Sequence, residues 1–174
     1  MKLIPWALAA VAAIGLAQSA AAQVGVAMGM RVIAFDPFAS DVPGGVEVTS
    51  LDAVIEGAHV LSLHCPLTPE NRGMINADTI GRMRDGAILV NTARGGLVDE
   101  PALLAAIASG KLRSAGLDSF ATEPLVGEHA FRGVANVVLT PHIGGVTSDA
   151  YVSMGTAAAR NVLAALEDAE AQPH

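Results

Sequence analysis

Short apolar runs and longer segments of helical pattern alternate along this chain from Arg31 onward. Most of the apolar runs are rich in β-branched residues or leucine, and they lack a strict alternation of apolar and polar positions. This pattern is typical of strands that are covered on both faces. The predicted strands cover residues 31–36, 59–64, 87–92, 114–118 and 136–140. Strands that alternate with helices predict βαβ units, and therefore an α/β fold with a doubly wound parallel sheet.

Signals for the start of a helix precede the helical segments. Thr49-Ser50-Leu51-Asp52 resembles a capping box, and Asn76 and Asp99 stand where the N-caps of two further helices are expected. The helix after Asp99 has a proline in its first turn and Gly110 near its end. Proline is favoured at the start of a helix and glycine just past its end. A long final helix is predicted over residues 148–168.

Composition narrows the classes of function. The 174 residues suit one domain, and with 52% apolar but only 3% aromatic residues its core must consist of Ala, Val, Leu and Ile. The net charge of −7, without a basic stripe interleaved with aromatics, argues against a nucleic-acid partner. Cys65 is the single cysteine, so an internal disulfide and a cysteine-cluster metal site are excluded. His59 and His64 lie at opposite faces of their predicted strand, so no metal site is predicted.

Residues 1–22 allow two interpretations. Lys2, an apolar stretch and then Ala20-Ala21-Ala22 form the three-part pattern of a secretory signal peptide, with cleavage near Ala22 and a periplasmic or secreted product. The alternative is a degenerate first strand–helix unit of the fold, in a protein that stays in the cytoplasm. The Ala-rich composition is poor for a strand, which favours the signal peptide. The run is short for a membrane span, so no stable membrane association is expected.

Polar residues and glycines gather at the carboxyl ends of the predicted strands, where open parallel sheets bind their ligands. They are Asp36-Pro37, His64-Cys65-Pro66, Thr92-Ala93-Arg94, Asp118 with Glu123, and Pro141-His142 with Gly144-Gly145. One such group at each of five strand ends predicts a binding site.

Four strings around these strand ends carry a family resemblance. "HCPLTPENRGMIN", "ILVNTARGGLVDEPALLAAIASGKL", "AGLDSFATEP" and "VVLTPHIGG" resemble the NAD-binding domain of the D-isomer-specific 2-hydroxyacid dehydrogenases. Phosphoglycerate dehydrogenase and hydroxypyruvate reductase belong to that family. The resemblance covers roughly residues 24 to 168. It implies a Rossmann-like fold, NAD as the cofactor, a small 2-hydroxyacid or 2-ketoacid as the substrate, and a homodimer formed through this domain.

The resemblance also implies a catalytic triad of Arg94, Glu123 and His142. The planar guanidinium of Arg94 would hold the carboxylate and carbonyl oxygen of the substrate. Gly95 and Gly96 would let the backbone turn sharply and leave room beside the arginine. His142 would donate a proton to the keto oxygen, or accept one in the reverse direction. Glu123 would favour the protonated imidazole, so the two side chains should lie within hydrogen-bonding reach or one water apart.

The cofactor-binding residues follow from the same resemblance. Asp118 matches the residue that hydrogen-bonds the nicotinamide carboxamide, and Asp36 matches the acid that binds the adenosine ribose. A carboxylate at Asp36 repels a 2′-phosphate, which favours NAD over NADP. The remaining implied cofactor-binding residues are Pro37, His64, Cys65, Pro66, Thr92, Ala93, Arg94, His142, Gly144 and Gly145. We expect Asp36, Arg94, Asp118 and His142 to lie along one edge of the sheet.

Two departures from the family keep a second hypothesis open. Gly15-Leu16-Ala17-Gln18-Ser19-Ala20 stands in place of the G-x-G-x-x-G fingerprint, and Ala17 adds a methyl group where the pyrophosphate should pack. The family's substrate domain is also missing from residues 23–174, so an N-terminally truncated domain is expected. The chain is therefore either an NAD-dependent oxidoreductase domain or a catalytically inactive remnant that only binds NAD or dimerises.

Overall fold

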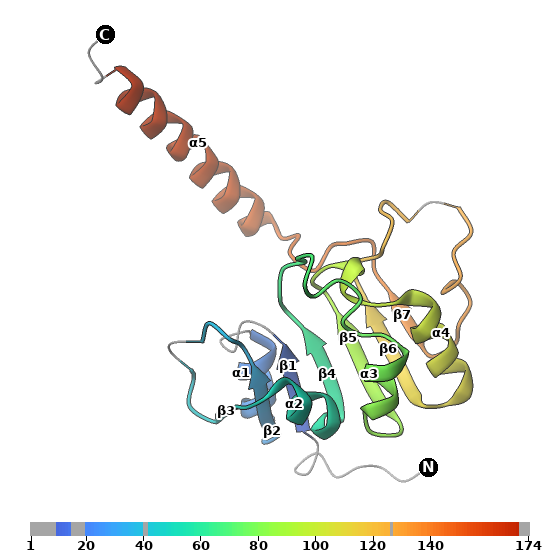
Figure 1. Ribbon diagram of the computed structural model, residues 1–174. Helices are drawn as coiled ribbons and strands as arrows, with labels where there is room; N and C mark the ends of the chain where they lie inside the picture. The colour runs from blue at the N-terminus through green and yellow to red at the C-terminus, as the bar shows by residue number, and fades with distance from the viewer. Residues whose placement is uncertain (1–9, 15–19, 40–41, 126, 171–174) are drawn as a thin grey trace. The chain divides into compact units, whose positions relative to one another are not determined.

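A computed structural model describes residues 10–14, 20–39, 42–125 and 127–170 of the chain. Seven parallel strands form one sheet in the order β3-β2-β1-β4-β5-β6-β7, shown in Figure 1. The strands are β1 (Ala10–Ile14), β2 (Arg31–Phe35), β3 (Val46–Val48), β4 (Val60–Leu63), β5 (Ala87–Asn91), β6 (Leu112–Leu117) and β7 (Val137–Leu139). The helices are α1 (Ala20–Ala27), α2 (Leu51–Gly57), α3 (Ala77–Arg82), α4 (Glu100–Ser109) and α5 (Ser148–Glu170). A 3₁₀ turn covers Gly95–Leu97.

The strand order confirms the predicted doubly wound parallel sheet. The five predicted strands correspond to β2, β4, β5, β6 and β7. The chain builds outward from β1 to β2 and β3, and then returns to place β4 on the other side of β1. The order therefore reverses between β1 and β4, and in open α/β sheets such a reversal opens a crevice for ligands at the carboxyl ends of the strands.

The prediction that the Ala-rich N-terminal segment makes a poor strand is wrong for residues 10–14. β1 pairs with strands on both sides, and Ala12 stands opposite both Ile33 of β2 and Leu61 of β4. Pairing on two sides outweighs the weak strand preference of alanine. The helix α1 follows, so the first strand–helix unit is present. Residues 15–19, which hold most of the altered fingerprint, lie outside the described residues.

The strand β3 was not predicted because it is only three residues long. It pairs with β2 at the edge of the sheet, and Glu47 and Val48 are exposed. Such a short, half-exposed segment has too few apolar positions to show a strand period.

The predicted ends of α3 and α4 are confirmed, whereas the predicted capping box from Thr49 to Asp52 is wrong, because α2 begins one residue later and has no reciprocal bond. The cap of α2 is Ser50, whose Oγ accepts a hydrogen bond from the backbone N–H of Ala53 at 3.2 Å. Asn76 and Thr79 form a reciprocal capping box at α3. Asp99 caps α4, and Gly110 ends it in the left-handed conformation with a φ of 79°. These caps fix where each helix begins, and thereby where each preceding loop must end.

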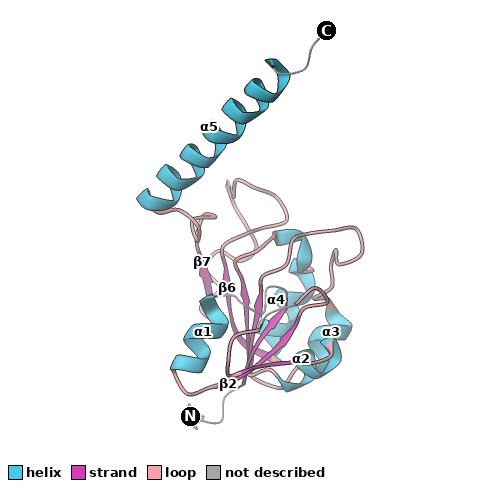
Figure 2. Ribbon diagram, turned by 90° about the vertical axis from the view of Figure 1, so that its left-hand side faces the viewer, coloured by secondary structure: helices cyan, strands magenta, loops and turns pink. Residues whose placement is uncertain are grey.

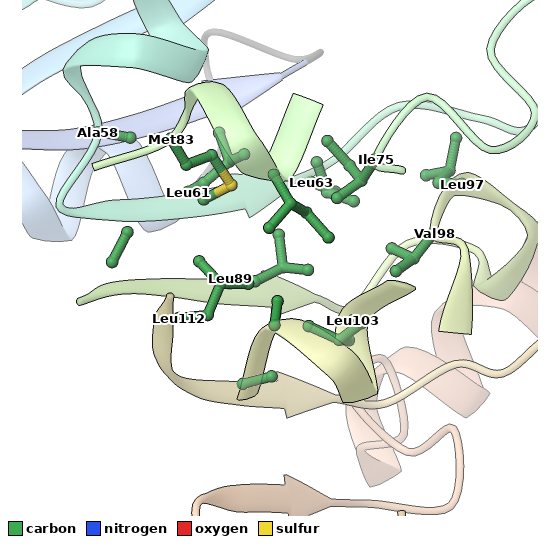
Figure 3. Close-up of a cluster of buried hydrophobic side chains, with 14 of the residues drawn as sticks. Ala58, Leu61, Leu63, Ile75, Met83, Leu89, Leu97, Val98, Leu103 and Leu112 are labelled. Atoms are coloured by element: carbon green, nitrogen blue, oxygen red, sulfur yellow. The ribbon is translucent and has the colours of Figure 1, made fainter. Parts of the chain in front are cut away.

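The first four helices cover both faces of the sheet. α1 lies on one face, and α2, α3 and α4 lie side by side on the other (Figure 2). Between the sheet and these three helices lies the main apolar core (Figure 3). Leu61, Leu63, Leu89 and Leu103 are fully buried there, and each contributes about 1.5–3 kcal/mol through burial. This packing holds β4 and β5 in place, and their carboxyl ends lead into the site.

The chain divides into two compact units, Met1–His142 and Ile143–His174. The second unit contains α5, which confirms the predicted final helix and carries exposed apolar side chains such as Tyr151 and Leu163. Among the helices of the described residues, none is both long and apolar enough to cross a membrane.

Candidate active site

Side chains from five strand ends lie along one edge of the sheet. Asp36 follows β2, His64 follows β4, Asp118 follows β6 and Thr140 follows β7, and the turn that carries Arg94 follows β5. Because all these strands run parallel, their carboxyl ends lie on the same side of the sheet. The prediction that Asp36, Arg94, Asp118 and His142 share one edge is confirmed.

The two aspartates at this edge lie far apart. β2 and β6 are separated by four strand spacings, which amounts to roughly 19 Å at about 4.8 Å for each spacing. Asp36 and Asp118 therefore suit the two ends of one extended ligand. A dinucleotide that lies across the switch point, with its ribose at Asp36 and its nicotinamide at Asp118, fits this arrangement.

Glu123 and His142 form a hydrogen-bonded pair. The Oε2 atom of Glu123 lies 2.7 Å from Nδ1 of His142, which confirms the predicted contact. The other carboxylate oxygen accepts a hydrogen bond from the backbone N–H of Phe120 at 2.8 Å. His142 has a φ of 56°, an uncommon left-handed conformation for a residue other than glycine, and histidine is among the residues that tolerate it.

Electrostatics keep Glu123 ionised. Partial burial would by itself raise the pKa of Glu123, but it is outweighed by the hydrogen bonds from His142 and Phe120 and by the charges of His142 and Arg94, so the pKa is lowered. An ionised carboxylate can only accept hydrogen bonds. Nδ1 of His142 must therefore carry the proton in this contact, and Nε2 is the atom that can exchange a proton with a substrate.

A pocket opens beside this pair. Its volume is about 290 Å³, and it is lined by Phe120, Glu123, Pro124, Leu125, Pro141 and His142. Most of the wall is apolar, and the polar groups are the carboxylate and the imidazole. An apolar pocket with a few convergent polar groups is typical of sites that bind small molecules.

Asn91 holds the turn that carries Arg94. The side chain of Asn91 is buried at 1% exposure. Its amide nitrogen donates to the carbonyl of Arg94 at 2.9 Å, and its oxygen accepts from the N–H of Ala93 at 3.1 Å. Arg94 is an exposed residue, and its guanidinium donates to the carbonyl of Ala93 at 2.6 Å and acts electrostatically on Glu123. The turn thus presents a cation on the same side as the acid–base pair.

Gly95 is required by a close approach of two backbones. A Cβ atom at Gly95 would lie 1.9 Å from the carbonyl carbon of Phe120 and 2.4 Å from the nitrogen of Ala121. At Gly96 the nearest atom would be the flexible end of Leu67, at 2.7 Å. Neither glycine has a positive φ, so the turn over Gly95–Leu97 does not require glycine for its backbone conformation. The room at Gly95 is needed by the backbone of Phe120, and the predicted room beside Arg94 stays a prediction.

The two aspartates differ in their surroundings. Asp118 is 3% exposed and accepts a hydrogen bond from the hydroxyl of Thr140 at 2.5 Å. The Oδ1 atom of Asp36 accepts from the backbone N–H of Phe38 at 2.9 Å and shapes the turn after β2. Pro37 lies within this turn.

The loop after β4 contains three of the predicted cofactor-binding residues, His64, Cys65 and Pro66. The Oγ atom of Ser62 lies 2.8 Å from Nε2 of His64. Asn71 folds the loop back, because its amide nitrogen donates to the carbonyl of Pro66 at 2.8 Å. Burial lowers the pKa of His64 and raises the pKa of Cys65, so both side chains are neutral at pH 7.

The other predicted contacts stay predictions. Thr92 is exposed at the end of β5, and Ala93 is buried beside it. Gly144 and Gly145 belong to the second unit. Within the described ranges, no three His, Cys, Asp or Glu side chains gather as the ligands of a metal ion would.

Several residues that shape the site were not predicted from the sequence. Asn91, Asn71, Glu100 and Thr140 act through hydrogen bonds to backbone or side chains of the site. A polar residue at the end of a buried apolar run, as at Asn91, was the one local signal available. The partners of Glu100 and Thr140 lie about twenty residues away, at Ala121 and Asp118, so neither contact has a local pattern.

The fold and the site together define a Rossmann-type nucleotide-binding domain, with a switch point between β1 and β4 and acidic residues at the ends of β2 and β6. The family model described as "D-isomer specific 2-hydroxyacid dehydrogenase, NAD binding domain" matches residues 7–144. The chain belongs to this family, whose domain binds NAD.

Known proteins support the assignment over most of this chain. It is 45% identical over 143 residues to D-3-phosphoglycerate dehydrogenase of Mycobacterium tuberculosis, a match that covers 80% of this chain and 27% of that protein. It is 44% identical over 132 residues to hydroxypyruvate reductase of Thermotoga maritima, covering 75% of this chain and 43% of the relative. The structure of D-lactate dehydrogenase with NAD+ from Lactobacillus jensenii superposes with a TM-score of 0.84 at 30% identity, over 92% of this chain and 53% of that one. The chain thus spans between about a quarter and a half of the length of these relatives.

Proposed function

We propose that this chain is the nucleotide-binding part of an NAD-dependent dehydrogenase that interconverts a D-2-hydroxyacid and a 2-ketoacid. The observation that carries the proposal is the contact of 2.7 Å between Glu123 and His142 in the wall of a largely apolar pocket. Arg94 supplies the cation that a substrate carboxylate needs. These three side chains provide binding, proton transfer and charge stabilisation at one place.

Each residue has a distinct part in the reduction of a ketoacid. The guanidinium of Arg94 binds the substrate carboxylate through paired charge-assisted hydrogen bonds. Nε2 of His142 donates a proton to the keto oxygen as charge develops there. Glu123 holds Nδ1 and stabilises the imidazolium before the transfer. When bound, NADH supplies the hydride.

The cofactor preference follows from Asp36. Its carboxylate stands at the end of β2, where an acid binds the ribose hydroxyls of NAD and repels the phosphate of NADP. Asp118 would accept a hydrogen bond from the carboxamide at the other end of NAD. The same carboxylate also accepts one from the hydroxyl of Thr140. The chain therefore uses NAD in preference to NADP.

The first strand–helix unit supports a cytoplasmic enzyme. Cleavage near Ala22 would remove β1, which lies between β2 and β4 in the sheet. Ala22 itself is fully buried in α1. We therefore propose that residues 10–27 are retained, and mass spectrometry of the protein from its own cell tests this. Recovery of a chain that begins at Gln23 would contradict it.

The homodimer implied by the family likewise stays a proposal, tested by light scattering of the purified chain.

The test of the function is NADH oxidation by the full chain, followed by the absorbance of the reduced nicotinamide with glyoxylate or hydroxypyruvate as substrate. We expect measurable turnover that Arg94→Ala and His142→Ala abolish. NADH binding without turnover in the parent chain would support the alternative, an inactive nucleotide-binding or dimerising module. Absence of NADH binding would contradict both the dehydrogenase and the nucleotide-binding module, and would leave the dimerising module alone.

A further inference from the structure

A second carboxylate lies close to the active-site loop. Glu100 is the first residue of α4, and its Oε1 atom accepts a hydrogen bond from the backbone N–H of Ala121 at 2.8 Å. Its side chain is 19% exposed. The contact joins α4 to a loop that lies 21 residues further along the chain. It therefore fixes the position of that loop against the helix.

His129 holds Glu100 in place. The Nε2 atom of His129 lies 3.5 Å from Oε2 of Glu100. The imidazole stacks on Phe131 at 5.4 Å between ring centroids and meets Phe120 edge to face at 5.7 Å. Both phenylalanines are buried. The carboxylate of Glu100 is thus fixed by an imidazole that is itself held between two rings of the core.

The loop held by Glu100 is the one that carries Glu123. Two consecutive amides of this loop are bound by carboxylates: the N–H of Phe120 by Glu123 and the N–H of Ala121 by Glu100. The backbone of Phe120 also rests directly on Gly95. Ala121 precedes Glu123 by two residues, so a shift at Ala121 would displace the carboxylate that faces His142.

We infer that Glu100 is a positioning residue that holds the 120–123 loop so that Glu123 reaches His142, an inference that rests on the proposed function of that pair. Glu100 does not face the pocket itself, and the residues that line the pocket do not include it. It acts through the backbone of Ala121. An amide acceptor at position 100 should therefore replace the carboxylate, whereas a shorter acid should not.

The test measures the pKa of Glu123 by carbon-13 NMR of its carboxyl group, with Glu123→Gln to assign the signal. In the parent chain the hydrogen bonds from His142 and Phe120 hold this pKa low. Glu100→Ala should raise it toward the ordinary value of about 4.3, because the loop loses its tie to α4. Glu100→Asp keeps the charge but is too short to reach Ala121, and should raise it as well. Glu100→Gln should leave it low, because its side-chain oxygen still accepts from Ala121.

Asp52→Ala provides the matched control. Asp52 is also an acid in the first turn of a helix, and it pairs with Arg82 at 2.6 Å, away from the site. The Asp52→Ala substitution should leave the pKa of Glu123 at the value of the parent chain. A folded Glu100→Ala or Glu100→Asp variant with the parent pKa at Glu123 would overturn the inference, and so would an equal rise in Glu100→Gln. Circular dichroism identifies variants that fail to fold, and Glu100→Asp, which keeps the helix-terminal charge, guards against that outcome.

The measurement is independent of turnover. If the parent chain oxidised no NADH, the proposed function would fail, while the effect of Glu100 on Glu123 would still be measured. If the parent chain were active and the pKa of Glu123 did not respond, the inference about Glu100 alone would fail.

Discussion

The Nδ1 atom of His142 and the Oε2 atom of Glu123 lie 2.7 Å apart, although 19 residues separate them in the sequence. Glu123 lies in the connection that follows β6, and His142 lies just after β7. The pair is thus assembled by the β6–β7 connection, and that connection is fixed in turn by Gly95 and Glu100.

Glu123→Gln tests whether this pair works as an acid–base device. The neutral amide cannot stabilise an imidazolium, so the proton donor is weakened while the fold is kept. We expect kcat for the reduction of a ketoacid to fall by about 10²–10⁴-fold, the usual contribution of a positioned acid or base. The Kd for NADH should change little. Steady-state kinetics and NADH fluorescence measure the two quantities. An unchanged kcat would remove Glu123 from the mechanism.

Gly95→Ala tests the close approach of the two loops. The added methyl group would lie 1.9 Å from the backbone of Phe120, and backbone cannot move aside as a side chain can. We expect a loss of about 3 kcal/mol, the upper end of the range for overpacked interiors. Thermal unfolding should show a lower Tm, by about 2–4 °C for each kcal/mol.

Gly81→Ala is the control for this substitution. Gly81 lies in α3, has open space at its Cβ position and lacks a positive φ. Alanine there should stabilise the chain by about 0.5–1 kcal/mol. A Gly95→Ala variant as stable as the parent chain would show that the two loops do not approach as closely as described.

The sheet could be predicted from the sequence because buried parallel strands leave a strong local pattern. Residues 87–92, for example, form an apolar run with β5 inside it. The strand β1 was the less favoured interpretation of residues 1–22, because its preference for the extended conformation comes from its neighbours: Ala12 is paired on both sides. Hydrogen bonding to strands on both sides outweighs the low strand propensity of an alanine-rich segment.

The site was predictable where its residues stand next to strand ends. Arg94 and His142 were found in this way, and the resemblance paired Glu123 with His142. Glu100 and Asn91 were not found as site residues, because their roles depend on backbone groups that the fold brings to them. A hydrogen bond to a distant amide leaves no spacing rule in the sequence.

Asn91→Ala tests the support beneath Arg94. The substitution leaves the N–H of Ala93 without its partner and removes one of two hydrogen bonds to the carbonyl of Arg94, which still accepts from the N–H of Leu97 at 3.2 Å. The buried N–H of Ala93 without a partner should cost about 1–3 kcal/mol. We also expect KM for the ketoacid to rise, because Arg94 loses its fixed position. Asn136→Ala is the control, since Asn136 is exposed. If the two substitutions lowered the free energy of unfolding in urea equally, the role of Asn91 would be contradicted.

The stability of the chain should fall as the pH drops from 7 to 5. Burial lowers the pKa of His64 in the folded state, so the unfolded state binds more protons below its own pKa of about 6.5. Stability is therefore greatest above pH 6.5 and is lost as the pH falls toward the folded pKa. His64→Gln keeps a partner for Ser62 and removes the titration, so its Tm should fall less over this range.

Part of the fall in Tm between pH 7 and pH 5 should remain in the His64→Gln variant. Burial, followed by the charge of Arg84, lowers the pKa of His59 as well, so His59 contributes in the same direction and the same window. Thermal unfolding at pH 7, 6 and 5 measures the slopes. Parallel curves for the parent chain and His64→Gln would show that His64 is not protected from protonation in the folded state.

Asp36→Asn tests the choice between NAD and NADP. The amide oxygen can still accept from the N–H of Phe38 and so preserve the turn after β2, while the charge is lost. A hydrogen bond to a charged group contributes about 1.5–3 kcal/mol and a neutral one about 1 kcal/mol, so binding of NADH should weaken by roughly tenfold. Binding of NADPH should strengthen, because the repulsion between the carboxylate and the 2′-phosphate is removed.

Asp118→Asn is the control for this substitution. It alters the nicotinamide end, which both cofactors share, so it should weaken the binding of both to the same extent. Titration of each variant with NADH and NADPH, followed by nicotinamide fluorescence, measures the ratio of the two affinities. If that ratio were the same in Asp36→Asn as in the parent chain, the adenosine ribose would not lie at the end of β2.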